Sequence, residues 1–229
     1  MIVRMGLLTR KPGVSNSEFH KHWRDIHGPL AARMPGLRRY HQNHVVDSRQ
    51  LAIEYQRGAW SLDGISELWF DSTEDMRQAI CSDAYKEVAR DHALFVGDTG
   101  LVTAEQQVVV PVPEGATSLV KRMSLLTRAP NIDSENFRHE WWRVHDKLVA
   151  SFPGLVGYTQ NLVVGREVQP GVPAPYEALP VDGIVELWFD DIAGLQRAFS
   201  SPEAMIAQAH ARDFIGSITT FLVETSHVV

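Results

Sequence analysis

The chain has 229 residues, 44% of them hydrophobic and 22% charged, which is the balance of a globular protein and not of a disordered one. The formal net charge of −6 argues against nucleic-acid binding, which needs clustered lysines and arginines. No apolar run reaches the roughly 18 residues of a transmembrane helix, the N-terminus resembles a strand more than a signal peptide, and Cys81 is the single cysteine, so we expect a cytoplasmic protein without membrane or nucleic-acid partners.

The first half of the chain predicts six elements in the order strand, helix, strand, strand, helix, strand. Alternating apolar residues mark the strands, and Ser15 or Ser17 can cap the first helix. The elements are expected at 2–10 (strand), from Ser15 or Ser17 to about 33 (helix), at 37–46 and 64–70 (strands), at 73–95 (helix, interrupted near 82) and at 97–110 (strand). A polar connection of unusual length, 47–62, separates the second strand from the third.

The second half repeats the first. Met5–Val46 aligns without a gap to Met123–Val164, with 19 identities in 42 positions, and the block 63–71 returns as 182–190. A period near 118 residues corresponds to a whole small domain. We therefore predict domains at 1–110 and 118–229, joined by a linker at 111–117.

The order βαββαβ is that of the ferredoxin-like motif, a four-stranded antiparallel sheet with both helices on one face. The other face of such a sheet is apolar and must be covered. We expect an α+β protein in which the two sheets pack face to face as an intramolecular pseudo-dimer, with a further homodimer left open. The connections 47–62 and 165–181 are expected to act as lids.

One spaced motif occurs in both halves: Phe19-x3-Trp23-x3-His27-x7-Pro35-Gly36-Leu37-x2-Tyr40, and again from Phe137 to Tyr158. It resembles the signature of the EthD family, within the dimeric α+β barrel superfamily, over nearly all of both repeats. The resemblance implies a barrel of paired sheets with a cleft in each domain. It also implies chemistry without metal or organic cofactor on small cyclic metabolites, although some members are known only as accessory proteins.

His27 and His145 are the predicted catalytic residues. Each lies one helical turn after a tryptophan, on the face assigned to the interior, which Ile26 in the first copy and Val144 in the second are expected to share. Histidine titrates near neutrality, so it can remove a proton from carbon or oxygen and return it without a cofactor. The resemblance places the family's acid–base histidine at this position. The alternative is a buried histidine that only fixes the end of the helix.

Tyr40 and Tyr158 are predicted to polarise a carbonyl or to hold an enolate oxygen, with a core aromatic as the alternative. Strand alternation places Tyr40 and Gln42 on one face and Asn43 on the other. The expected substrate-binding residues, all present in both copies, are Trp23 and Trp141, Gln42 and Gln160, Glu67 and Glu186, and Trp69 and Trp188.

Three of these pairs also have structural interpretations. The carboxylates of Glu67 and Glu186 lie in an apolar segment, and we favour an ion pair with Arg4 or Arg122 over a role as proton carrier. The tryptophans are expected in the core more than at a ligand.

Metal binding is not expected, because the histidines that enrich the first half are replaced in the second. The pairs are His20 and Arg138, His22 and Glu140, His41 and Thr159, and His44 and Leu162. The EthD pattern does not imply haem either. Muconolactone isomerisation is one activity of characterised relatives, and one relative uses a cysteine in its site. Cys81 aligns with Ser200 and does not match that cysteine, so the resemblance does not imply muconolactone isomerase chemistry for this chain directly.

The sequence therefore favours a cofactor-independent acid–base enzyme, of isomerase, lyase or decarboxylase type, acting on a small cyclic or aromatic oxygenated metabolite. The alternatives are a cofactor-free oxidase or monooxygenase of the same fold and a non-catalytic binding or accessory protein. An open cleft of several hundred Å³ at the histidines would favour an enzyme, and a closed apolar interior would favour binding. Gly28-Pro29 becomes Asp146-Lys147 in the second copy, so the two clefts need not be equally competent.

Overall fold

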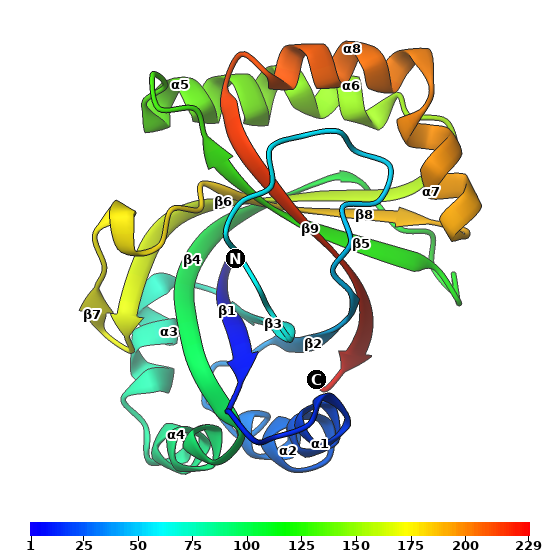
Figure 1. Ribbon diagram of the computed structural model, residues 1–229. Coiled ribbons are helices and arrows are strands. Elements are labelled where there is room, and N and C mark those ends of the chain that lie inside the picture. Colours follow the sequence, from blue (N-terminus) through cyan, green and yellow to red (C-terminus); the bar gives the residue numbers. More distant parts are fainter.

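The computed structural model describes all 229 residues, and its two halves have the same order of elements (Figure 1). The elements of the first half are β1 (Ile2–Arg10), α1 (Asn16–His22), the π-helical turn η1 (Trp23–His27), α2 (Gly28–Ala31), β2 (Arg39–Asp47), β3 (Gly64–Phe70), α3 (Thr73–Ile80), α4 (Asp83–Phe95) and β4 (Val96–Val110). Those of the second half are β5 (Val120–Arg128), α5 (Ser134–His139), the π-helical turn η2 (Glu140–His145), α6 (Asp146–Ala150), β6 (Leu155–Gln169), β7 (Val172–Pro173), the short 3-10 helix η3 (Tyr176–Ala178), β8 (Gly183–Phe189), α7 (Ile192–Phe199), α8 (Pro202–Ala211) and β9 (Ile215–His227).

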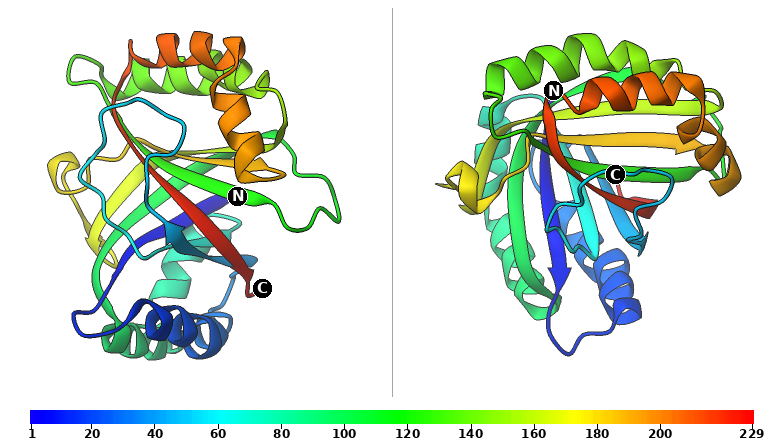
Figure 2. Two further views of the ribbon diagram at one scale, coloured as in Figure 1. Left: turned by 45° about the vertical axis from the view of Figure 1, so that its right-hand side comes forward. Right: turned by 45° about the horizontal axis from the view of Figure 1, so that its top comes forward.

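All nine strands belong to one antiparallel sheet in the order β4-β1-β3-β2-β9-β5-β8-β6-β7, and a further pairing of β4 with β6 closes eight of them into a barrel. The expected α+β class is confirmed. The two half-sheets are joined edge to edge at β2–β9 and β4–β6, so they surround one common interior and do not stack as separate layers. The helices lie outside the barrel, those of the first half on one side and those of the second half on the other (Figure 2).

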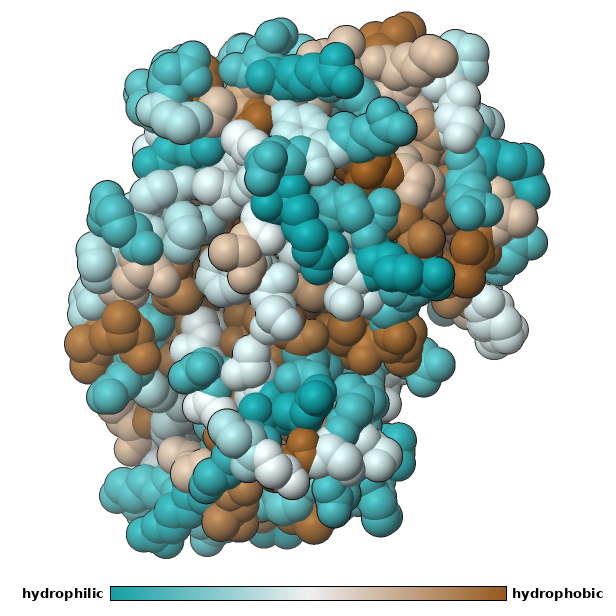
Figure 3. Space-filling view, viewed as in Figure 1, coloured by the Kyte–Doolittle hydropathy of each residue, from teal (hydrophilic) through white to brown (hydrophobic).

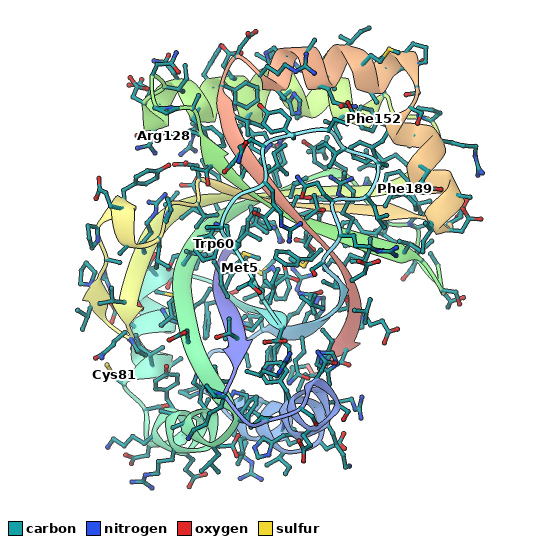
Figure 4. All side chains as sticks on the ribbon, viewed as in Figure 1. Met5, Trp60, Cys81, Arg128, Phe152 and Phe189 are labelled. Atoms are coloured by element: carbon teal, nitrogen blue, oxygen red, sulfur yellow. The ribbon has the colours of Figure 1, made fainter.

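The barrel interior holds the largest apolar cluster, 16 buried residues drawn from both halves. Met5 of β1 belongs to it, and Trp60 from the connection before β3 packs against it (Figure 4). A second layer of apolar contacts lies between the helices and the outer face of the barrel, where Phe152 and Phe189 are found in the second half (Figure 4). No helix combines the length and the apolar character needed to cross a membrane.

The first helix of each half begins as predicted and then departs from regular geometry. The Ser15 hydroxyl accepts from the backbone N–H of Glu18, whose side chain accepts from the backbone of Ser15; in the second half Asp133 caps the helix. The turn that carries the histidine is π-helical in both halves. The wider turn moves Ile26 off the buried face, where the sequence predicted it, and leaves it 49% exposed.

Gly64 and Gly183 keep the tryptophan of this turn in place. A Cβ atom at Gly64 would lie 2.3 Å from the ring of Trp23, and one at Gly183 would lie 2.4 Å from the ring of Trp141. Strand and helix can approach this closely only where the strand has no side chain. The repeated glycines therefore fix the depth of each tryptophan.

Each long connection crosses to the other half. Residues 48–62, which we call the crossing loop, leave β2 and lie over β9 and the second-half helices (Figure 1, cyan). There the Tyr55 hydroxyl donates to the carbonyls of Ile215 and Ala211, at 2.6 and 3.1 Å. In the opposite direction, the extended end of β6 pairs with β4 and brings Glu167 to Arg4, with 2.8 Å between Oε2 and Nη2.

The end of β6 and β7 also form a protruding hairpin. Val168 and Val172 are each 46% exposed there, and a hydrophobic patch covers this edge of the molecule (Figure 3, left).

Candidate functional site

One small cavity lies in each half, between the helices and the outer face of the barrel. The first encloses about 70 Å³ and the second about 60 Å³. Neither approaches the several hundred Å³ that an open active-site cleft would offer. Equivalent side chains line both, among them Arg4 and Arg122, Trp23 and Trp141, His27 and His145, and Tyr40 and Tyr158. All four residues predicted to be catalytic thus lie in these two clefts, two in each.

In the first cleft, His27 is held by a carboxylate from α4. His27 Nδ1 lies 2.8 Å from Asp91 Oδ2, and His22 Nε2 lies 2.8 Å from Asp91 Oδ1. An ionised carboxylate only accepts hydrogen bonds, so His27 Nδ1 carries the hydrogen and a neutral ring presents Nε2 as an acceptor. Burial lowers the pKa of His27, and the adjacent Asp91 partly offsets this effect. His27 is therefore a neutral, oriented imidazole suited to act as a base.

Tyr40 faces the same cavity with its hydroxyl proton free. Its oxygen accepts from Trp23 Nε1 at 2.9 Å and from Gln42 Nε2 at 3.2 Å, which occupies both lone pairs. Burial raises the pKa of Tyr40 to about 12, so the phenol stays protonated. The arrangement leaves the O–H group as a donor for an oxygen atom in the cavity.

Gln42 and Gln160 hold the neighbouring tryptophan and tyrosine residues of the clefts in place. Both are fully buried, and their amides donate to the carbonyls of Trp23 and Trp141 at 2.7 and 2.8 Å. Gln160 also donates to the Tyr158 hydroxyl at 2.7 Å. These contacts position the catalytic candidates, and neither amide lines a cavity.

The second cleft has a different relay behind its histidine. His145 Nδ1 lies 3.2 Å from His210 Nδ1, and His210 Nε2 lies 3.0 Å from Glu140 Oε2. Burial, and then His210, lower the pKa of His145 to about 3. The acid and the histidine have exchanged positions between the copies, since Glu140 aligns with His22 and His210 aligns with Asp91.

Glu67 and Glu186 point into the barrel and away from both clefts. They do form ion pairs, but the predicted partners are wrong: Lys121 Nζ lies 2.6 Å from Glu186 and 3.3 Å from Glu67. Lys121 was not singled out from the sequence because its counterpart in the first copy is Val3. Burial opposes the charge of Lys121, but the two carboxylates outweigh it and raise its pKa.

Trp69 and Trp188 belong to the barrel as well. With Lys121 and Glu186 they line a pocket of about 610 Å³ at one mouth of the barrel. Trp69 Nε1 donates to Gln106 Oε1 at 3.0 Å, and the Lys121 ammonium lies 4.9 Å from the centre of the Trp188 ring. Of the predicted substrate-binding residues, Trp23 and Trp141 therefore line the clefts and Trp69, Trp188 and Glu186 line this separate mouth, whereas Gln42, Gln160 and Glu67 line none of the three.

Besides Lys121, the comparison of the two copies missed three residues that shape the clefts: Asp91, His210 and Tyr55. The first two differ in type between the copies, so a search for repeated residues passes over them; their signal is the complementary exchange with His22 and Glu140. Nowhere do three or more histidine, cysteine, aspartate or glutamate side chains converge in a way that could hold a metal ion.

The EthD domain model matches the chain twice, over residues 11–99 and 129–217. No curated protein gives a significant match. An anthrone oxidase-like protein superimposes with a TM-score of 0.65 and 12% identity over 99% of this chain and 92% of that one. A proposed monooxygenase from Lactobacillus acidophilus NCFM gives a TM-score of 0.59 and 10% identity over 99% and 94%. At these identities the likeness concerns the fold alone.

An EthD family protein from Bacillus halodurans C-125 is 26% identical, covers 46% of this chain and 98% of its own, and has a TM-score of 0.38. The two family matches together span more than half of the sequence and include both copies of the tryptophan–histidine–tyrosine motif. The chain belongs to the EthD family.

Proposed function

We propose that the first cleft catalyses proton transfer on a small oxygenated metabolite, without help from a cofactor. The observation that carries the proposal is the hydrogen bond between His27 and Asp91, which orients a neutral imidazole in the cavity that the free hydroxyl of Tyr40 also lines. The polar wall of this cleft, which includes Ser66 and Thr99, suits chemistry on an oxygenated molecule better than storage of an apolar one. Its volume of about 70 Å³ favours a small substrate or requires the cleft to open.

The proposed proton transfer requires no oxidant. His27 Nε2 takes a proton from a carbon next to a carbonyl, and the electron pair of the C–H bond moves to the carbonyl oxygen. Tyr40 donates its hydrogen bond to the enolate oxygen that forms, and Asp91 stabilises the imidazolium. Return of the proton to another carbon completes an isomerisation, and loss of a leaving group from the enolate completes a lyase reaction.

We also propose that each half is a ferredoxin-like unit. This rests on the order βαββαβ and on the strand order β4-β1-β3-β2, which β9-β5-β8-β6 repeats in the second half.

Deuterium exchange tests the proposed chemistry without knowledge of the physiological substrate. A panel of small cyclic ketones and lactones in D2O is incubated with the protein, and incorporation at carbon is followed by NMR. The wild type is expected to accelerate exchange of some members, and His27→Gln to reduce that rate by about 10²–10⁴-fold. His145→Gln is the matched control and is expected to retain most of the rate.

Undiminished exchange in a folded His27→Gln variant would contradict the proposal, as would a panel without any accelerated member. Oxygen consumption is recorded in parallel. Uptake of O2 that depends on His27 would identify the oxidase alternative, in which the same carbanion reacts with oxygen.

A further inference from the structure

Arg122 lines the second cleft as a buried cation without an acidic partner. Its side chain is almost inaccessible to solvent, with 2% of the residue exposed. Nε donates to Ser124 Oγ at 3.3 Å, Nη1 donates to the Leu51 carbonyl at 3.2 Å, and the guanidinium lies 4.3 Å from the centre of the Phe199 ring. None of these groups carries a negative charge.

The equivalent arginine of the first half is neutralised. Arg4 Nη2 lies 2.8 Å from Glu167 Oε2, which the extended end of β6 supplies. At the offset of 118 residues, the counterpart of Glu167 is Arg49, a cation that pairs with Asp47 in an exposed position. The crossing loop therefore offers Arg122 the backbone carbonyl of Leu51, where the opposite crossing brings a carboxylate to Arg4.

An unpaired buried charge is costly, because a guanidinium removed from water without a counter-charge loses its hydration and gains no ion pair in return. Burial alone lowers the pKa of Arg122 to about 9, so the group is still charged at neutral pH. The wall around it offers no compensation, because 14 of the 18 lining residues are hydrophobic. A bound anion would supply the missing charge.

We propose that the second cleft binds a small carboxylate with a compact apolar body, whose carboxylate pairs with Arg122. The cavity of about 60 Å³ has room for roughly four to six non-hydrogen atoms if each needs the 10–15 Å³ of a water molecule. Isobutyrate has about that size at the upper end of the range, and it combines a carboxylate with a branched apolar part.

The crossing loop is the cover of this site. Tyr55 lines the cavity and is held by the carbonyls of Ile215 and Ala211, and the Leu51 carbonyl occupies one guanidinium donor. A carboxylate that enters the cavity can replace the Leu51 carbonyl as the acceptor for Nη1. The site thus joins a loop of the first half to an arginine of the second.

Calorimetric titration with isobutyrate tests the proposal, with isobutyramide as a neutral probe of the same shape. Isobutyrate is expected to bind at least tenfold more tightly than isobutyramide, and Arg122→Met to abolish this preference. Arg122→Lys, which retains the charge, is expected to keep part of it. The matched control is Arg4→Met combined with Glu167→Gln, which removes the equivalent pair in the first half and leaves isobutyrate binding unchanged.

Equal binding of the two probes, absence of saturable isobutyrate binding, or full binding by Arg122→Met would each overturn the proposal. The comparison of the two probes on the wild type decides the matter even if the Met variant does not fold. Benzoate and benzamide extend the test: a preference for benzoate that depends on Arg122 would support an anion site whose loop opens for a ring. The site is separate from His27, so His27→Gln is expected to bind isobutyrate normally, and failure of either proposal leaves the other intact.

Discussion

The two clefts have the same frame and different walls. Tryptophan, histidine, tyrosine and glutamine occupy equivalent positions in both. The first cleft is also lined by Ser66, Tyr85, His92 and Thr99, and the equivalent positions of the second half hold Val185, Ala204, Ala211 and Ile218. Duplication has thus preserved the groups that hold each helix on the barrel. The walls, which decide what the cavity can accept, have diverged toward a polar site with an oriented base and an apolar site with a free cation.

The relay behind each histidine shows how such divergence occurs without loss of the fold. In the first half Asp91 joins His22 and His27, and in the second His210 joins Glu140 and His145. Either order satisfies the polar atoms between the two helices. Only the arrangement in the first half places a carboxylate in direct contact with the histidine of the cleft. We therefore expect the halves to differ in reactivity more than in stability.

The largest expected effect concerns a residue that only the second half has. Lys121→Met leaves Glu67 and Glu186 buried without their shared cation, and loss of one partner of a buried ion pair costs about 3–5 kcal/mol. We expect a loss of that size in the free energy of unfolding, measured by urea denaturation. The triple variant Lys121→Met, Glu67→Gln, Glu186→Gln is expected to recover most of it; no recovery would show that Lys121 acts through contacts other than its charge.

A double-mutant cycle tests the exchanged relay. His22→Glu and Asp91→His in the first half together recreate the arrangement of the second. Each single variant should destabilise the protein, because His22→Glu faces Asp91 and Asp91→His leaves His22 and His27 without their acceptor. The double variant is expected to recover stability, with a coupling energy of up to about 3 kcal/mol.

The same double variant separates stability from reactivity. It should remain slow in deuterium exchange, since His27 has lost its carboxylate. Two outcomes would contradict this interpretation. The losses of stability in the two single variants could add up in the double variant, or the double variant could exchange deuterium as fast as the wild type.

The smallest expected effect is a change in how the free energy of unfolding depends on acid, and it arises from His145 in the second half. Histidine in the unfolded chain titrates near 6.5, whereas burial and His210 hold the pKa of His145 at about 3. The unfolded state therefore binds a proton that the folded state excludes, and stability present above pH 6.5 is lost as the pH falls toward 3. Between pH 7 and pH 5, His145→Gln should lose about 2 kcal/mol less of its free energy of unfolding than the wild type. Parallel pH profiles would contradict this origin of acid sensitivity.

Local sequence signals predicted most elements of the fold. The cap at Ser15, the interruption of the second helical stretch near 82 and the alternation of the strands depend on neighbouring residues, and the structure has them in place. The π-helical turns were missed because five or six residues of wider winding hardly disturb the spacing of apolar positions. The displacement of Ile26 is the visible consequence.

The parts of the sites that could not be predicted depend on partners distant in the chain. The repeat identified His27 and His145 because both copies keep them, but Asp91 and Lys121 differ between copies and make contacts across helices or across the barrel. The pattern of the 47–62 connection likewise indicates a cover and contains nothing that says which half it covers.

The closure of the barrel by β9 has a consequence for synthesis on the ribosome. β9 is the last strand to emerge, and it pairs with β2, which was made early. Until then the first half carries an unpaired strand edge and an apolar sheet face that nothing covers, which is the kind of surface that recruits other chains. The growing polypeptide must therefore keep one half from aggregating while its other half is still being translated.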